Sequence, residues 1–258
     1  HITDEIKKRI IKGAGNSDVA IVEIGGTVGD IESQPFLEAI RQMKIDLQSY
    51  QTLYMHLTLL PFLKSAGETK TKPTQRSVKE MLSHGLQPDI LVCRSEKPME
   101  EEERKKIALF TNVKPNAVIS MPDVDSIYKI PIELNYQKVD EIVFEKFKLN
   151  SSKKPNLRDW RKVIKEDLEP KESIKISMVG KYTELADAYK SLNEALKHGG
   201  FKNNLKVDID YVDSEKLDSK NVHKKLGKSH AILVPGGFGE RGIEGMVTAV
   251  KYARTKLI

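Results

Sequence analysis

The chain has 258 residues, of which 39% are hydrophobic and 31% charged, and its net charge is +6. This balance excludes intrinsic disorder, and no apolar run approaches the roughly 20 residues of a membrane span. The single cysteine, Cys93, excludes a disulfide scaffold within the chain and favours a reducing cytoplasm. The basic charge favours anionic partners, although a lysine-rich solvated surface explains it equally well.

The first strong signal is the apolar run 18–24, which is rich in Val and Ile. The pattern predicts a strand buried on both faces of a parallel sheet, between helices over 3–12 and 35–48. Glu23 interrupts the run, and three glycines and two more acids follow it up to Glu32. A buried carboxylate needs a partner. Glu23 therefore either binds a divalent metal that carries a nucleotide phosphate, or caps a helix or pairs with a lysine.

A second buried strand is expected over 53–60, and His56 within it is interpreted as a core histidine rather than a ligand. The polar segment that follows contains Lys70 and Lys72 ahead of Pro73. Because the residue before a proline favours extended backbone, both lysines are expected on one side of an extended segment, with a helix starting at Pro73. Lysines beside a helix N-terminus form an anion cradle that suits a triphosphate, and a basic surface loop is the alternative.

The remaining pattern alternates between strands and helices in two series, which predicts an α/β protein. A polar, turn-rich stretch over 150–172 separates the series and is interpreted as a packed linker. The further expected elements of the first series are strands 89–93 and 117–120 and helices from 100 and over 126–147. Those of the second are strands 174–180, 205–211 and 231–234, a helix 186–198 ended by Gly199 and Gly200, and a helix 243–254.

Neither series contains a zinc-ligand spacing, a Ser-His-Asp order or a G-x-x-x-x-G-K-[ST] phosphate loop. Both ends of the chain interrupt a pattern, because His1 leads directly into a helix and 256–258 resemble the start of a buried strand. The sequence is therefore expected to be an internal piece of a longer protein.

Five strings in one order resemble the CTP synthase family, the glutamine-dependent amidoligases that convert UTP to CTP with ATP. They are 22–33, 70–75, 123–131, 179–182 and 235–239. The resemblance implies an amidoligase (synthetase) domain over 1–149, built like a P-loop NTPase of the dethiobiotin-synthetase type. It further implies a linker over 150–172 and a class I glutamine amidotransferase domain, flavodoxin-like, over 173–258. The phosphate loop would precede His1 and the glutaminase cysteine would follow Ile258, so the chain alone is expected to be inactive.

The resemblance also implies roles for single residues. Glu23 would be a magnesium ligand, and residues 241–245 would form a lid over the glutamine site. Gly236 and Gly237 would bind glutamine, and Gly237 would present a backbone N–H to the developing oxyanion. The ATP adenine would contact the backbone of Pro122, Asp123 and Val124, where Pro122 replaces a lysine common in relatives. UTP and CTP would be bound by Gly29, Asp30, Ile31, Glu32, Lys70, Thr71, Lys72, Pro73, Thr74, Gln75 and Lys106.

In the implied mechanism, ATP phosphorylates O4 of UTP and ammonia from glutamine then displaces the phosphate. Mg²⁺ is the expected cofactor, ATP the co-substrate, GTP an allosteric activator and CTP a feedback inhibitor of a cytoplasmic homotetramer. No nucleic-acid or membrane partner is expected, because the basic residues are dispersed and aromatic residues make up only 6% of the chain. Two alternatives stay open: an enzyme of the cobyrinate amidase type, which does not explain the 70–75 string, and a non-catalytic nucleotide sensor or assembly subunit.

Overall fold

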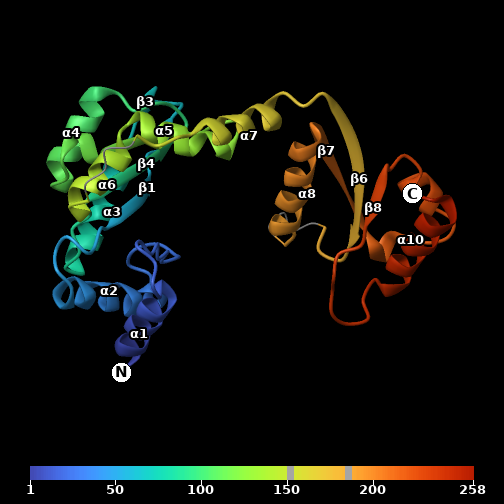
Figure 1. Ribbon diagram of the computed structural model, residues 1–258, viewed down its shortest axis with the longest axis horizontal. Coiled ribbons are helices and arrows are strands. Elements are labelled where there is room, and N and C mark those ends of the chain that lie inside the picture. Colours follow the sequence, from blue (N-terminus) through green and yellow to red (C-terminus); the bar gives the residue numbers. More distant parts are fainter. Residues whose placement is uncertain (150–153, 184–187) are drawn as a thin grey trace. The chain divides into compact units, whose positions relative to one another are not determined.

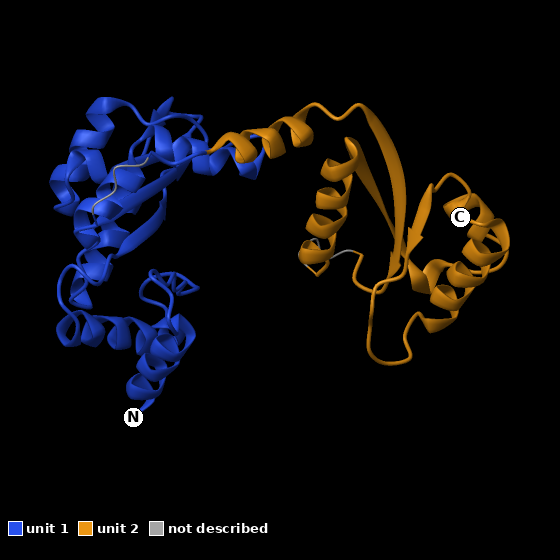
Figure 2. Cartoon of the chain, in the orientation of Figure 1, with its two compact units in different colours: residues 1–156 blue, residues 157–258 orange. Residues whose placement is uncertain are grey.

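A computed structural model describes residues 1–149, 154–183 and 188–258. The chain divides into two compact units, residues 1–156 and 157–258 (Figure 2). The expected linker over 150–172 therefore contributes to both units, and its first four residues, 150–153, lie outside the described ranges. No helix in the described part of the chain is long and apolar enough to cross a bilayer.

The first unit contains a parallel sheet in the order β1-β4-β5 (Figure 1). Its strands are β1 (Met55–Leu59), β4 (Ile90–Ser95) and β5 (Val118–Pro122). The central strand β4 is buried from Ile90 to Cys93, as its continuous apolar run predicts. The edge strand β1 is buried on one face only, and the face that carries Met55, Leu57 and Leu59 is exposed.

Helices and a small hairpin complete the first unit. The helices are α1 (Ile2–Ala14), α2 (Gln34–Asp46), α3 (Lys72–Ser83), α4 (Glu101–Thr111), α5 (Ile130–Tyr136) and α6 (Val139–Phe147). The hairpin pairs β2 (Phe62–Leu63) with β3 (Glu68–Thr69) just before α3. The side chains of Glu100 and Glu103 cap α4 reciprocally, which explains why acids open that helix.

The core of the first unit lies where α4, α5 and α6 meet the sheet. Ile90, Leu91, Ile107, Val118 and Ile119 are all fully buried there. Burial of one such side chain stabilises the fold by about 1.5–3 kcal/mol. The core therefore fixes the position of β4 and β5, on whose carboxyl ends the candidate site depends.

The strand expected over 18–24 does not form, so that prediction is wrong. The segment has no regular structure, and Ile21 is 95% exposed. A strand requires a neighbour that pairs with its backbone N–H and C=O groups. In the described part of the first unit, the parallel sheet consists of β1, β4 and β5, and none of them pairs with this segment.

Helix forms over most of 126–147, as expected, but it is broken into a 3₁₀ turn (Ile127–Lys129), α5 and α6. Lys138, between α5 and α6, has a φ of +61°, a left-handed value that no helix interior accommodates. The break lets the amide of Gln137 bond both backbone groups of Ser120, at 2.9 and 2.7 Å. Gln137 thereby supplies hydrogen-bond partners to the backbone N–H and C=O of Ser120 on the edge strand β5.

The second unit contains a parallel sheet in the order β7-β6-β8. Its strands are β6 (Glu172–Gly180), β7 (Leu205–Asp213) and β8 (Ala231–Leu233). Its helices are α7 (Arg158–Leu168), α8 (Lys190–Asn203), α9 (Val222–Leu226) and α10 (Ile243–Lys256). Both units are therefore α/β with parallel sheets, which confirms the fold class expected from the alternation.

Helix α8 does not end at Gly199 and Gly200, as the sequence suggested, but continues to Asn203 and is terminated by left-handed Asn204. A Cβ at Gly200 would lie 2.8 Å from Cγ2 of Val207. The glycine therefore permits close packing of α8 on β7 rather than ending the helix. The expected start of this helix at 186 lies outside the described residues.

Candidate nucleotide and glutamine sites

The carboxyl ends of β1, β4 and β5 meet at one edge of the first sheet, and α3 begins there. Thr74 is fully buried, and its Oγ1 lies 3.2 Å from both the Leu59 carbonyl oxygen and Oγ1 of Thr58. Thr71 is also buried, and its Oγ1 accepts a hydrogen bond from Nε2 of Gln75 at 3.2 Å. The Thr74 hydroxyl thus holds α3 against β1, and the Thr71 hydroxyl is engaged by the first turn of α3, at the edge where open α/β sheets bind ligands.

Lys70 and Lys72 flank Thr71, the N-cap of α3. Thr71 has helical angles (φ −80°, ψ −20°), so the prediction of an extended segment is wrong. Pro73 is tolerated inside the helix because the first turn requires no donor from its nitrogen. Lys72 is exposed, whereas the ammonium of Lys70 pairs with Glu68. Both lysines therefore lie at the start of one helix.

Lys106 belongs to the same region, since α4 packs against α3. The ammonium of Lys70 lowers the pKa of the Glu68 carboxyl, chiefly through their hydrogen bond, and the charge of Lys106 lowers it further. We call Lys70, Lys72 and Lys106 the lysine group. Cations beside a helix N-terminus favour the binding of a polyphosphate, because the helix dipole and the ammonium charges both attract anions.

The second predicted part of the UTP site is a tight turn around Asp30. Its Oδ2 accepts a hydrogen bond from the Thr27 amide at 3.0 Å, and its own amide donates to the Thr27 carbonyl at 3.0 Å. Gly29 has a φ of +104°, which glycine alone adopts without strain. Ile31 and Glu32 follow in a short 3₁₀ turn and are exposed. The Asp30 carboxylate is therefore engaged in ordering its own loop.

This turn lies away from the lysine group. A Cβ at Gly29 would lie 3.2 Å from Cγ of Glu80. Glu80 is roughly two turns beyond Lys72 on α3, about 12 Å along the helix axis. Among the described residues, no hydrogen bond or ion pair joins 29–32 to the lysine group. The structure thus brings the three lysines together and does not bring the Asp30 turn to them.

Glu23, the expected magnesium ligand, is exposed. Within the described residues it makes no ion pair, so the alternative of a lysine partner is not found there. The same residues contain no group of three His, Cys, Asp or Glu side chains that could hold a metal ion. Mg²⁺ in nucleotide sites commonly uses one or two carboxylates together with phosphate oxygens and waters. Glu23 fits only that mode, as a single carboxylate beside nucleotide phosphates.

The expected adenine segment, Pro122 to Val124, begins at the last residue of β5, at the same edge of the sheet as the start of α3. The amide of Asp123 donates to the Ser95 carbonyl at 2.8 Å, and Oδ1 of Asp123 accepts from Nε of Arg94 at 2.9 Å. The Asp123 side chain is therefore engaged by protein. The segment offers a ligand mainly backbone groups, which commonly orient a bound base.

Cys93, the single thiol of the chain, is fully buried on β4. Burial raises the pKa of its thiol to about 11, and its nearest polar neighbour is Oγ1 of Thr58 at 3.7 Å. A nucleophilic cysteine requires an accessible thiolate. Cys93 is therefore a core side chain.

In the second unit, Gly236 and Gly237 follow β8 in an exposed turn. No local pattern places Lys181 beside them, yet its Nζ donates to the carbonyls of Phe238 and Gly239 at 2.8 and 2.6 Å. The available signal was topological. Lys181 follows β6 and the turn follows its parallel neighbour β8, so both lie at one sheet edge.

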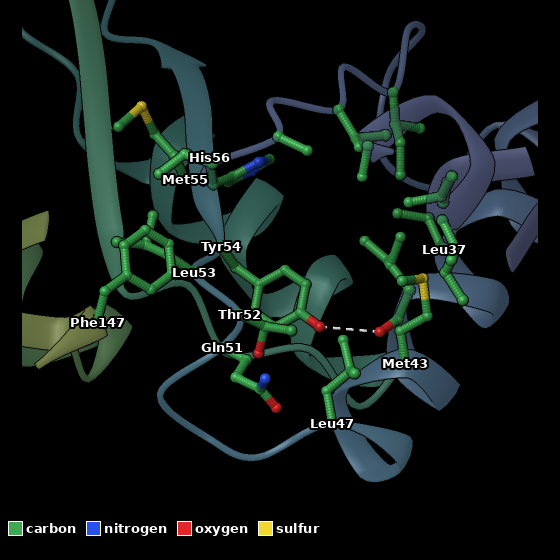
Figure 3. Close-up of a pocket in the computed structure, with 18 of the residues that line it drawn as sticks. Leu37, Met43, Leu47, Gln51, Thr52, Leu53, Tyr54, Met55, His56 and Phe147 are labelled. Atoms are coloured by element: carbon green, nitrogen blue, oxygen red, sulfur yellow. Dashed lines mark hydrogen bonds between the residues drawn. The ribbon is translucent and has the colours of Figure 1, made fainter. Parts of the chain in front are cut away.

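A cavity of about 620 Å³ lies in the first unit, and none of the lysine group lines it. Figure 3 draws part of its lining. Its lining includes Val19, Leu37, Tyr54 and Met81, and no lysine or arginine lines it. The Tyr54 hydroxyl donates to the Ile40 carbonyl at 2.8 Å, the dashed line in Figure 3. The cavity lies between α1, the 18–28 segment, α2 and the start of β1, and without a lysine or arginine in its lining it is unsuited to phosphate.

Comparison with protein-family models agrees with this geometry. Residues 1–149, more than half of the chain, match the model of the CTP synthase N-terminus. Residues 184–258 match the model of the class I glutamine amidotransferases. The first match covers the unit with the lysine group, and the second covers the glycine turn. The chain belongs to the CTP synthase family.

Proposed function

We propose that the chain supplies binding residues for the ATP-dependent amination of UTP to CTP with ammonia drawn from glutamine. Its family places it in pyrimidine nucleotide synthesis, as part of a glutamine-dependent ligase. The observation that carries the finer proposal is the lysine group at the start of α3, on the ligand-binding edge of the first sheet.

The reaction has two chemical steps. The γ-phosphoryl group of ATP is transferred to O4 of UTP, which makes that oxygen a good leaving group. Ammonia then attacks C4, and phosphate departs with O4, which leaves the amino group of CTP. Both steps develop negative charge on phosphoryl oxygens, and fixed cations stabilise such charge.

In this proposal Lys70, Lys72 and Lys106 hold the triphosphate of UTP. Lys70 is already paired with Glu68, so a phosphate oxygen replaces the carboxylate when UTP binds. Lys72 is exposed at the first turn of α3 and meets the incoming ligand first. CTP carries the same triphosphate and competes for the same cations, which accounts for feedback inhibition.

The ATP adenine rests on the backbone of 122–124, and residues 29–32 contribute to the pyrimidine nucleotide site. Mg²⁺, when bound beside Glu23 and the phosphates, neutralises part of their charge. We also propose GTP as an allosteric activator and a cytoplasmic homotetramer as the working assembly. These assignments rest on family membership.

In the second unit, Gly236 and Gly237 bind glutamine, the backbone N–H of Gly237 stabilises the oxyanion, and 241–245 cover the site. Glutamine hydrolysis in this class requires an activated thiolate. Since Cys93 is the only cysteine in the sequence and is fully buried, we propose that the 258 residues alone do not hydrolyse glutamine. A glutaminase assay on the purified chain, read as ammonia release, checks this statement.

The test of the nucleotide site is a calorimetric titration of the chain with UTP and Mg²⁺. Lys70→Ala, Lys72→Ala and Lys106→Ala should each weaken binding by about 10- to 100-fold, because a charge-assisted contact contributes about 1.5–3 kcal/mol. Lys105→Ala is the matched control. Lys105 neighbours Lys106 on α4, but its ammonium pairs with Glu102 at 3.2 Å.

CTP should displace UTP, and uridine should bind equally weakly to all the variants because it lacks the phosphates. The variants must keep the circular dichroism spectrum and unfolding midpoint of the unaltered chain. Unchanged UTP affinity in a folded Lys72→Ala chain would contradict the assignment. So would a folded unaltered chain that does not bind UTP.

A further inference from the structure

We infer that Lys181 is a positioning residue that holds the glycine turn 236–239 in the conformation used for glutamine hydrolysis. Its catalytic consequence rests on the proposed function of this turn, whereas its contacts rest on geometry alone. Lys181 is only 7% exposed although it carries a charge. A buried ammonium is costly unless polar partners surround it.

Those partners are carbonyl groups of the turn. Nζ of Lys181 donates to the carbonyls of Phe238 and Gly239 at 2.8 and 2.6 Å. A Cβ at Gly237 would lie 3.5 Å from Cε of Lys181, so the side chain runs along the turn in van der Waals contact. Within the described residues Lys181 has no carboxylate in ion-pair range. Among the described residues, the partners of its ammonium are therefore carbonyl groups of the turn.

Other interactions leave the turn unrestrained. The Phe238 side chain is 97% exposed, so packing does not anchor it. Among the described residues, no backbone–backbone hydrogen bond involves 236–239. Ordering each residue costs about 1–2 kcal/mol of backbone entropy, and three of these four residues are glycine. The two bonds from Lys181 offset this cost.

The base of the side chain is itself fixed at the end of β6. The Tyr189 hydroxyl oxygen accepts hydrogen bonds from the amides of Lys181 and Tyr182 at 3.2 and 3.4 Å. A Cβ at Gly180 would lie 3.0 Å from Cζ of Tyr189, which explains why glycine ends the strand. Nη2 of Arg241 donates to the Lys181 carbonyl at 3.4 Å. Lys181 thus links a rigid strand end to a turn with little order of its own.

The direction of the two bonds sets the direction of the donors. In a planar trans peptide the C=O and the following N–H point opposite ways. Because the carbonyls of Phe238 and Gly239 face Lys181, the amides of Gly239 and Glu240 face away from it. Loss of the ammonium frees these two peptides to rotate. The turn that carries the Gly237 N–H is then no longer held in one conformation, and oxyanion stabilisation requires a donor whose position is fixed in advance.

The first arm of the test measures order in the turn. The chain is labelled with ¹⁵N-glycine, and amide order parameters are compared among the unaltered chain, Lys181→Met, Lys181→Arg and Lys175→Met. Lys175 is the matched control, since it lies on the same strand and its Nζ pairs with Asp210 at 2.7 Å. In Lys181→Met, the amide order parameters of Gly237 and Gly239 should fall from about 0.85 to below about 0.6. The order parameter of Gly199, in α8, should be the same in all variants. Lys181→Arg should keep part of the order of the turn, because arginine is also charged and can donate to the carbonyls. An ordered turn in Lys181→Met would overturn the inference.

The second arm measures CTP formation by the complete enzyme with glutamine or with ammonia. Lys181→Met should lower kcat/KM for glutamine by about 10- to 100-fold, the effect of losing a charge-assisted bond, while the ammonia-driven rate stays within about twofold. An equal loss with both nitrogen donors would overturn the inference. A disordered turn with unchanged glutamine kinetics would instead overturn the proposed function of the turn.

Discussion

Nε2 of His56 lies 2.8 Å from Oγ of Ser77, and this contact joins β1 to α3. His56 is 8% exposed, which confirms its interpretation as a core histidine. Burial lowers the pKa of its imidazole below the usual 6.5. At neutral pH the contact therefore joins a neutral ring to a hydroxyl.

The chain should lose stability as the pH falls below 6.5. Because the pKa of His56 is lower in the folded state, the unfolded state binds the proton more readily. The stabilising contribution is thus present above pH 6.5 and is lost as the pH falls through the folded pKa. Urea unfolding at a series of pH values should show that the free energy of unfolding falls less steeply below pH 6.5 in His56→Gln than in the unaltered chain. His198→Gln, at an exposed helix position, is the control, and identical pH profiles for His56→Gln and the unaltered chain would contradict the prediction.

Cys93 should be unreactive in the folded chain. Burial raises the pKa of its thiol to about 11 from 9.0, and the side chain is fully buried. A thiol reagent at about pH 8 should therefore label the chain only after unfolding in guanidinium. The neutral thiol also favours folding below pH 9, and this contribution is lost as the pH rises toward about 11. Rapid labelling of the native chain would show that β4 opens.

Two helical glycines should respond oppositely to alanine. A Cβ at Gly245 in α10 would overlap the Ser214 carbonyl oxygen and lie 3.1 Å from that of Leu217. Gly245→Ala should therefore cost about 1–3 kcal/mol, as overpacking does. A Cβ at Gly199 in α8 would meet nothing within 4 Å. Gly199→Ala should stabilise the chain by about 0.5–1 kcal/mol, and denaturant unfolding of both variants decides the point.

An isoleucine pair tests the irregular segment 18–24. Ile21 is 95% exposed, whereas Ile119 on β5 is fully buried. Ile119→Ala should destabilise the chain by about 2–5 kcal/mol. Ile21→Ala should change the free energy of unfolding by no more than about 0.5 kcal/mol. A large loss in Ile21→Ala would show that this residue is buried in solution.

Local rules predicted those parts of the fold that depend on nearby residues. Pro73 marked the start of α3, and the acids after Glu100 marked the start of α4. The apolar run 89–93 predicted the buried strand β4, because a continuous run suits a strand covered on both faces. Lys70 and Lys72 were recognised together because a helix start binds anions, and Lys106 came only from the family resemblance.

Features that depend on distant residues were not predictable in this way. The run 18–24 looks like a strand, but no local signal states whether a neighbouring strand will pair with it. Gly200 looks like a helix end, yet its role depends on contact with Val207 on another element. The contact of Lys181 with Phe238 spans 57 residues, and no period or motif encodes it. Contacts between residues so far apart in the sequence can be identified only once the three-dimensional structure is known.

The exposed face of β1 bears on how the protein behaves in concentrated solution. β1 is an edge of its sheet in the described chain, and Met55, Leu57 and Leu59 are exposed on it. Such an edge recruits a strand from another molecule. The net charge of +6 opposes this recruitment by mutual repulsion, and added salt screens the repulsion. Concentrated samples therefore stay clear longest at low ionic strength and become turbid as salt is raised.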